Sequence, residues 1–273
     1  MPEKFKYDFQ ENLIYNSPKK IQIARDMLER YTGSPAADFQ KYIILTNFHN
    51  YLTSFCQTYH TKQQIGSVMQ VAHATEIKLS MVDIKIGAPT AALIIELLAA
   101  VEPTAVLFLG MCGGLHRSLV VGDFILPMAA IRDEGVSHHF IPPQVPSLPT
   151  FKIQKFVSQI IVENHFDYRT GVVHSTDYRF WELDEAFKRQ LYEERAIAID
   201  MESSALFSVG FVSKVPVGAL LLVSDLPLKK GGIKTKESSR KVFAKFTQSH
   251  IDIGIQAMVE IQQRGEKIRH YRW

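Results

Sequence analysis

The chain has 273 residues, of which 46% are hydrophobic and 22% are charged, and this composition supports a large buried core and excludes a wholly disordered chain. The formal net charge of +3 is too small to indicate a nucleic-acid binder, although it is compatible with a local basic patch for a phosphorylated ligand. The two cysteines cannot build a disulfide framework, and no cysteine or histidine spacing predicts a metal site.

No basic and apolar leader opens the sequence, and no apolar run reaches the ~18 residues that a membrane span requires. We therefore expect a cytoplasmic protein with neither a membrane nor a nucleic acid as its partner. The length suits one large α/β domain.

The N-terminal part of the chain is polar and charged and carries one segment of helical spacing, at residues 21–28. Gly33 and Pro35 follow this segment and are typical of a helix end and a turn. We therefore predict that residues 1–40 form an N-terminal helical arm. One domain is predicted to follow over residues 41–273, because no shift of composition marks a further boundary.

Short apolar runs separated by turn residues recur beyond the arm and predict strands. These runs are residues 42–47, 67–72, 77–86, 105–110, 123–127, 171–177, 196–200 and 217–225. Pro89 suits the first turn of a helix over residues 90–101, and a long amphipathic helix is predicted over residues 236–263. Several strands are continuously apolar, which is typical of a central sheet covered by helices on both faces. The pattern therefore predicts the α/β class.

Polar residues gather at the C-terminal ends of four of these strands, at residues 110–114, 174–177, 200–202 and 224–225. Residues that act on a ligand sit where the strands of such sheets end. Because the four ends belong to one sheet, we predict that they form one composite site.

The glycine-rich stretch at residues 110–114 lets a ligand approach the backbone closely. It is neither a P-loop nor a dinucleotide-binding fingerprint, and a tight turn without a ligand explains it equally well. Cys112 is interpreted as a buried packing residue and not as a nucleophile, because no base stands at a suitable spacing.

Asp200, Met201 and Glu202 follow an apolar strand. Two carboxylates on one face accept hydrogen bonds from a vicinal diol such as a ribose, with Met201 packing beside them. An acidic pair that caps the next helix is an equal alternative. Asp225 ends the most hydrophobic strand, where a carboxyl either caps the next element or acts as a general acid of raised pKa.

Arg179 and Trp181 lie just beyond another strand end, where a planar side chain can stack on a heterocyclic base. Trp181 serves equally well as part of the core. The neighbouring pair His138 and His139 is interpreted as a surface feature and not as a metal site.

Taken together, these stretches resemble the nucleoside phosphorylase and nucleosidase superfamily, and within it the catalytic domains of AMP nucleosidases. The matching stretches are residues 30–36, 46–47, 86–89, 112–115, 122–123, 176–182, 198–203, 215–216, 223–228 and 233–234. The resemblance implies a single-domain, three-layer α/β/α fold with a mixed, partly barrel-like central sheet, so that residues 41–273 form the catalytic domain. It also implies a homo-oligomer, with a hexamer common among relatives, and no cofactor.

The resemblance implies hydrolysis of the N-glycosidic bond of AMP, or a close purine nucleotide, to adenine and ribose 5-phosphate. Asp225 then donates a proton to purine N7, and Glu202, together with Asp200, holds the ribose hydroxyls while Met201 lines the sugar. The residues expected around the base and its loop are Cys112, Gly113, Thr176, Asp177, Arg179, Trp181 and Ser224. Candidates for the 5′-phosphate are Arg30, Asn47, Arg117, Lys229, Lys230 and Lys234. Asn47 and Glu76 are also candidates to hold the attacking water.

The chain departs from the family in two respects. AMP nucleosidases carry a further N-terminal domain linked to regulation, and 273 residues leave no room for it. The family's Cys-Gly-Gly-Leu motif is followed by Arg, whereas His116 stands here and Arg117 comes one place later.

Two other functions compete with nucleotide hydrolysis. A purine nucleoside phosphorylase would use inorganic phosphate, but phosphorylases of the superfamily carry an Arg at the position of Phe108, which cannot bind phosphate. A non-catalytic nucleoside-binding protein of the same fold is the second alternative, and the retention of both Asp225 and Glu202 speaks against it.

Overall fold

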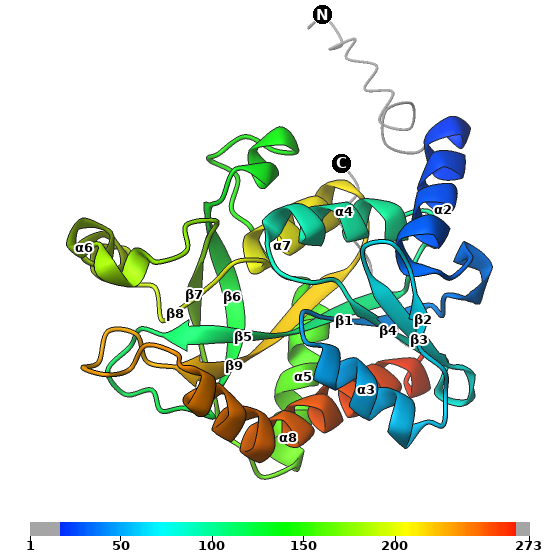
Figure 1. Cartoon of the computed structure of the whole chain (residues 1–273). Coiled ribbons are helices and arrows are strands. Elements are labelled where there is room, and N and C mark those ends of the chain that lie inside the picture. The colour runs from blue at the N-terminus through cyan, green and yellow to red at the C-terminus, as the bar shows by residue number, and fades with distance from the viewer. Residues whose placement is uncertain (1–16, 266–273) are drawn as a thin grey trace, which may run out of the picture.

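A mixed sheet organises the computed structural model, which describes residues 17–265 (Figure 1). Over these residues the strand order is β2-β3-β4-β1-β5-β8-β7-β6-β9. The strands are β1 Tyr42–Thr46, β2 Gln64–Ile65, β3 Gln70–Ala74, β4 Leu79–Asp83, β5 Ala105–Gly114, β6 Phe124–Asp133, β7 Tyr168–Thr176, β8 Ala198–Asp200 and β9 Val217–Asp225.

Half of the sheet closes into a barrel. β9 pairs in parallel with β5, in a register that runs from Val106 opposite Val217 to Gly113 opposite Asp225, and it also pairs antiparallel with β6. The strands β5, β8, β7, β6 and β9 therefore form a closed ring, while β1 and β4 extend the sheet beyond it in parallel. The predicted mixed and partly barrel-like sheet is confirmed.

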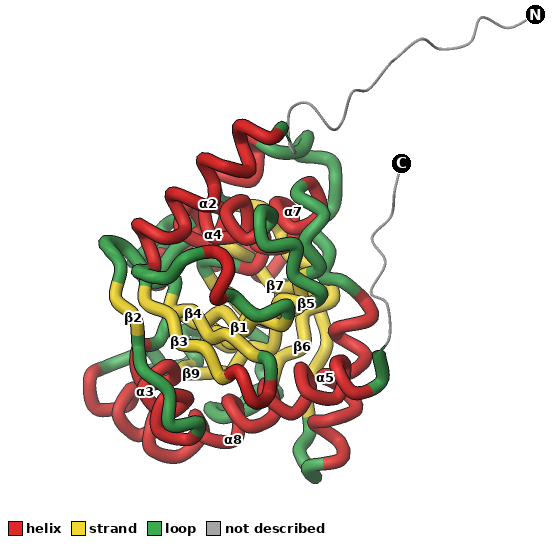
Figure 2. The backbone as a smooth tube through the Cα atoms, turned by 90° about the vertical axis from the view of Figure 1, so that its right-hand side faces the viewer, coloured by secondary structure: helices red, strands yellow, loops and turns green. Residues whose placement is uncertain are grey.

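Helices cover both faces of the sheet (Figures 1 and 2). One layer holds α2 Pro18–Thr32, α4 Ala88–Leu98 and α7 Ser203–Val212, and the opposite layer holds α3 His49–Thr58, α5 Phe151–Glu163 and α8 Lys236–Gln263. A short helix, α6 Glu185–Glu193, lies to one side next to β7 and β8. Each layer has its own buried apolar cluster against the sheet, so the predicted three-layer α/β/α fold is confirmed.

The helix predicted within the N-terminal arm is α2, and it ends at Gly33, whose φ of 77° is the left-handed conformation that glycine adopts readily. Ala24 and Leu28 of α2 are buried in the same cluster as α4. Residues 1–16 of the predicted arm lie outside the described residues. The division at residue 40 stays a prediction.

The other elements match the sequence predictions unevenly. The C-terminal helix spans residues 236–263 as predicted, and the strand predicted from residue 123 continues to Asp133. The strand predicted over residues 77–86 was too long, because Lys78 and Lys85 adopt φ angles of 50° and 64° on either side of Leu79–Asp83. Likewise, the strand predicted over residues 67–72 begins only at Gln70. Across residues 17–265, no helix has the length and apolar character needed to cross a bilayer.

Candidate active site

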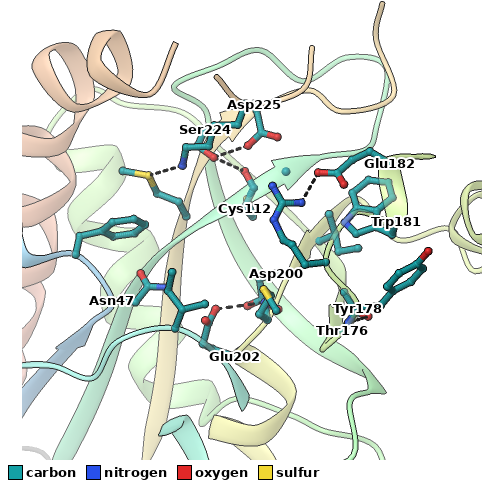
Figure 3. A pocket seen from close by; sticks show the side chains of 18 residues that line it. Asn47, Cys112, Thr176, Tyr178, Trp181, Glu182, Asp200, Glu202, Ser224 and Asp225 are labelled. Carbon is teal, nitrogen blue, oxygen red and sulfur yellow. Dashed lines mark hydrogen bonds and ion pairs between the residues drawn. The ribbon is translucent and has the colours of Figure 1, made fainter. Parts of the chain in front are cut away.

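A cavity of about 270 Å³ lies at the C-terminal ends of four barrel strands, β5, β7, β8 and β9, and of β1 (Figure 3). The predicted strand ends after β5, β7, β8 and β9 all contribute to it. The lining residues are Asn47, Phe48, Ile86, Met111, Cys112, Gly113, Thr176, Tyr178, Arg179, Trp181, Glu182, Ile199, Asp200, Met201, Glu202, Ser224, Asp225 and Lys234. Figure 3 shows Asp225 and Glu202 at opposite ends of this cavity.

Asp225 is the last residue of β9 and is partly buried. The Ser224 hydroxyl donates to Asp225 Oδ1 over 2.6 Å and also approaches the Cys112 carbonyl at 3.3 Å. Burial raises the pKa of Asp225, while the Ser224 hydrogen bond and the positive charges of Lys234 and Arg179 oppose that rise. Because the net direction is upward, the neutral acid persists to a higher pH than in an exposed aspartate, as proton donation requires.

Glu202 follows β8 and is 2% exposed. Its Oε1 accepts a hydrogen bond of 2.8 Å from the Gly87 N–H, and its Oε2 accepts one of 3.2 Å from the Met201 N–H. The Asn47 side chain donates to the same carboxylate. Burial and the negative charge of Asp200 nevertheless raise the pKa of Glu202 to about 7. A carboxyl held in this way is poised between its two protonation states near neutral pH.

Asp200 has a different environment, although it also lines the cavity. Its Oδ1 accepts from the Ser175 hydroxyl over 2.5 Å, and its Oδ2 accepts from both the N–H, at 3.0 Å, and the hydroxyl of Ser203. Ser203 is the first residue of α7, so Asp200 satisfies a free N–H at a helix start and ties it to β7. The helix-capping interpretation therefore describes Asp200, whereas Glu202 keeps its side chain for the cavity.

The wall at the end of β7 is formed by Thr176 and the segment that follows it. Trp181 lines the cavity and is also 4% exposed in a small core cluster, so both of its sequence interpretations apply. Arg179 forms an ion pair with the buried Glu182. Asp177 was expected near the base but lies outside the cavity lining, since it is exposed and accepts the Gly135 N–H at 3.2 Å.

The glycine-rich stretch lies inside β5. Burial raises the pKa of Cys112 well above its ordinary value, which agrees with a packing role and not with a nucleophile. A Cβ atom at Gly113 would come within 3.1 Å of the Pro227 ring and 3.2 Å of Ile199. Glycine at this position therefore lets β8 and the segment that follows β9 approach β5 closely.

Among the cations of residues 17–265, Arg179 and Lys234 line the cavity. Burial lowers the pKa of Lys234, the nearby Asp225 partly restores it, and the Lys234 Nζ lies 3.7 Å from Met111 Sδ. The other phosphate candidates lie elsewhere: Arg30 donates to the Tyr31 hydroxyl, Lys229 donates to the Leu119 carbonyl, Lys230 is exposed, and Arg117 lines a second cavity.

Asn47 follows β1 and lines the cavity, whereas Glu76 is exposed in a short 3-10 helix outside it. Phe108 does not reach the cavity, because it is fully buried with its ring beneath Gly110. The pair His138 and His139 belongs to no metal-binding cluster, and residues 17–265 contain no group of three or more ligating side chains suited to a metal.

Sequence reasoning did not select some of the lining residues. These are Phe48, Ile86, Met111, Tyr178, Glu182 and Ile199. Ile86, Tyr178 and Glu182 stand within the motifs that carry the resemblance, so their neighbours could have indicated them. Gly87, which donates to Glu202, was also missed as a site residue, although it stands in the matching stretch 86–89 and its φ of 109° favours glycine.

Comparison with known proteins identifies the class that this sheet and cavity define. The family model of the phosphorylase superfamily matches residues 41–259, and the chain belongs to this superfamily. Within it, the chain is similar to AMP nucleosidases, as the sequence motifs predicted.

The crystal structure of AMP nucleosidase from Bacteroides thetaiotaomicron VPI-5482 is 38% identical and has a TM-score of 0.80, covering 90% of this chain and 99% of that one. The AMP nucleosidase of Escherichia coli K12 is 27% identical over 94% of this chain and 62% of its own length, so the chain spans less than two thirds of that relative. Uridine phosphorylase from Vibrio fischeri ES114 shares the fold at 19% identity, with a TM-score of 0.75 over 88% of this chain and 98% of that one.

Proposed function

We propose that the chain is an N-glycosidase that hydrolyses AMP, or a close purine nucleotide, to the free base and ribose 5-phosphate. The observation that carries the proposal is the presence of two carboxyls of raised pKa, Asp225 and Glu202, at opposite ends of one cavity. The similarity to AMP nucleosidases supports the nucleotide as substrate.

In this proposal, Asp225 protonates the leaving purine base. When the bond between C1′ and N9 breaks, its electron pair moves onto the purine, and a proton delivered to N7 makes the base a better leaving group. Because burial raises the pKa of Asp225, its carboxyl keeps that proton to a higher pH than an exposed aspartate does. Ser224 fixes Oδ1, so the proton is carried on Oδ2 toward the base.

Glu202 is assigned to the ribose, whose hydroxyls its carboxylate binds. Positive charge develops on the ribose as the bond breaks, so an ionised carboxylate on the ribose hydroxyls stabilises the transition state more than the ground state. The N–H groups of Gly87 and Met201 fix the carboxylate from the protein side. Its remaining lone pairs are available to the hydroxyls.

Lys234 is assigned to the 5′-phosphate. Arg179 is already paired with Glu182, whereas Lys234 forms no ion pair within residues 17–265. A partly buried ammonium that forms no ion pair with a carboxylate suits a phosphate group of the substrate.

Water is assigned as the nucleophile. A phosphorolytic site must hold a second phosphate beside the 5′-phosphate, and two such anions repel each other unless dense positive charge compensates them. Phe108 supplies none and lies in the core, which leaves Arg179 and Lys234 as the cations lining the cavity within residues 17–265. Because Arg179 is already paired with Glu182, this positive charge is too small to compensate two phosphate groups.

The experiment is cleavage of AMP in phosphate-free buffer, with both products identified by chromatography. Adenine and ribose 5-phosphate formed without added phosphate support the proposal, and the Asp225→Asn chain serves as the matched inactive control. A strict requirement for phosphate, with a ribose 1-phosphate product, assigns the chain to the phosphorylases. Binding of nucleotides without cleavage under either condition assigns it to non-catalytic binding.

We also propose three further properties that the sequence analysis predicts. They are a homo-oligomer in which neighbouring subunits complete each site, a cytoplasmic location, and a catalytic domain that begins near residue 41. Light scattering of the purified chain measures the first, and deletion of residues 1–40 followed by a folding assay measures the third.

A further inference from the structure

A second cavity, of about 680 Å³, lies outside the candidate active site. Its lining residues are Leu115, His116, Arg117, Leu191, Tyr192, Arg195, Ala196 and Leu228. The lining contains two guanidinium groups, an imidazole and a phenol, and no carboxylate. The cavity therefore favours an anion.

The guanidinium groups of Arg117 and Arg195 are both available to bind an anion. Within residues 17–265, neither Arg117 nor Arg195 forms an ion pair or donates a side-chain hydrogen bond; Arg195 lies over the ring of Tyr192, 4.9 Å from its centroid. The nearby Glu194 is already engaged, because its carboxylate accepts from the buried His174 at 2.7 Å. Within residues 17–265, no carboxylate therefore forms an ion pair with either guanidinium group.

His116 adds a donor of defined orientation. Its Nδ1 accepts the Ser118 N–H at 3.3 Å and lies 2.8 Å from the Ser118 hydroxyl. In the neutral ring the proton is therefore on Nε2, which is left as a donor. Two Arg forks and this N–H match the several acceptor oxygens of a phosphate group better than a single carboxylate.

The rest of the lining is apolar or aromatic. Leu115, Leu191 and Leu228 contribute aliphatic surface, and the ring of Tyr192 is 68% exposed. Exposed aromatic and aliphatic surface beside two guanidinium groups fits a ligand that joins a phosphate to a planar or apolar part. The volume lies in the range of small-molecule sites, which is roughly 300–1,000 Å³.

We propose that this cavity is a second ligand site, for a small organic phosphate whose phosphate is held by Arg117, Arg195 and His116 and whose planar part packs on Tyr192. Arg117, for which the active-site cavity gives no role, receives one here.

The second site is built on the same chain segments as the first. β5 carries Cys112 in the active-site cavity and continues directly into Leu115, whose N–H is held at 2.9 Å by the Ile197 carbonyl just before β8. β9 ends at Asp225, and Leu228 follows shortly after it. A ligand that orders these loops therefore alters AMP cleavage, a consequence that rests on the proposed function.

Calorimetric titration of the full chain with phenyl phosphate, inorganic phosphate and phenol tests the site without any turnover. We expect phenyl phosphate to bind more tightly than inorganic phosphate and phenol to show no binding. Arg117→Ala and Arg195→Ala should each weaken phenyl phosphate binding about tenfold or more, since each removes charge-assisted hydrogen bonds. Arg189→Ala, an exposed arginine of α6 outside the cavity lining, is the matched control and should leave the affinity unchanged.

Three results would overturn the inference. Phenyl phosphate affinity that is equal in all three variants places its binding elsewhere, and Lys234→Ala then shows whether it occupies the active site. Inorganic phosphate that binds as tightly as phenyl phosphate rejects an organic ligand. A change of oligomeric mass in Arg117→Ala or Arg195→Ala, measured by light scattering, makes the cavity an interface between copies of the chain. The binding result stands even if the chain does not cleave AMP.

Discussion

The Ser224 hydroxyl donates a hydrogen bond of 2.6 Å to Oδ1 of Asp225. This bond stabilises the ionised carboxylate and lowers the pKa of Asp225, whereas burial, the larger effect, raises it. The pKa of Asp225 is thus set by opposing effects of its surroundings. Mutation can remove either the acid itself or the hydrogen bond that lowers its pKa.

Removing the acid itself gives the largest expected loss. Asp225→Asn cannot supply an acidic proton to purine N7, and we expect the rate of AMP cleavage to fall by ~10²–10⁴-fold, the usual contribution of general acid catalysis. Circular dichroism should show an intact fold. A variant that retains more than about a tenth of the rate would reject the assignment.

Removing the hydrogen bond between Ser224 and Asp225 is expected to shift the pH dependence of kcat/KM. Ser224→Ala takes away a contact that lowers the pKa of Asp225, so that pKa rises further. Because the acid acts only when protonated, activity is lost as the pH rises through its pKa. We therefore expect the alkaline limb of the kcat/KM profile to shift to higher pH in Ser224→Ala. A shift to lower pH, or none, would mean that Asp225 is not the group that titrates there.

Lys234→Ala tests whether Lys234 recognises the 5′-phosphate of the substrate. We expect it to reduce AMP cleavage far more than adenosine cleavage, because only AMP carries the 5′-phosphate. Lys230→Ala removes an exposed lysine of the same loop that does not line the cavity, and it should leave both rates unchanged. Equal losses on both substrates in Lys234→Ala would show that this lysine acts on Asp225 and does not recognise phosphate.

Much of this site could be predicted from the sequence, because residues near each other in the chain carried it. Asp225 and Glu202 each end or follow an apolar run, and the amphipathic spacing of residues 236–263 likewise placed α8 correctly. Contacts between distant residues could not be predicted in this way. The Gly87 N–H reaches Glu202 across 115 positions, and the pairing of β9 with β5 that closes the barrel leaves no local trace.

Two structural features could not be predicted from the local sequence. α7 is buried all round, so its sequence has no polar face and no helical period to detect. Asp200 and Glu202 look alike in the sequence, but only the fold shows that Ser175 and Ser203 engage both oxygens of Asp200. The sequence alone therefore predicts that Asp200 and Glu202 bind the ribose in the same way.

Asp200→Asn tests both the stabilising hydrogen bonds of Asp200 and the effect of its charge on the pKa of Glu202. An amide nitrogen cannot accept the hydrogen bonds that one carboxylate oxygen accepts, so we expect a loss of about 1–3 kcal/mol in the free energy of unfolding. The charge of Asp200 raises the pKa of Glu202, so its removal lowers that pKa, and the acidic limb of the activity profile should move to lower pH. Asp177→Asn, an exposed carboxyl outside the cavity, is the control and should leave this limb in place. An unchanged limb in Asp200→Asn would show that the two carboxyls do not interact.

Glu202 also predicts how stability depends on pH. Its pKa rises from an ordinary value of 4.5 to about 7 in the folded chain. Between these values the folded state binds more protons than the unfolded state, so the contribution of Glu202 to stability is fully present below pH 4.5 and is lost as the pH rises through about 7. Glu202→Gln removes this titration, and urea unfolding at pH 5 and pH 8 should show a smaller difference between the two pH values than in the unmodified chain. The same decrease in both chains would place the titrating group elsewhere and would leave Glu202 with an ordinary pKa.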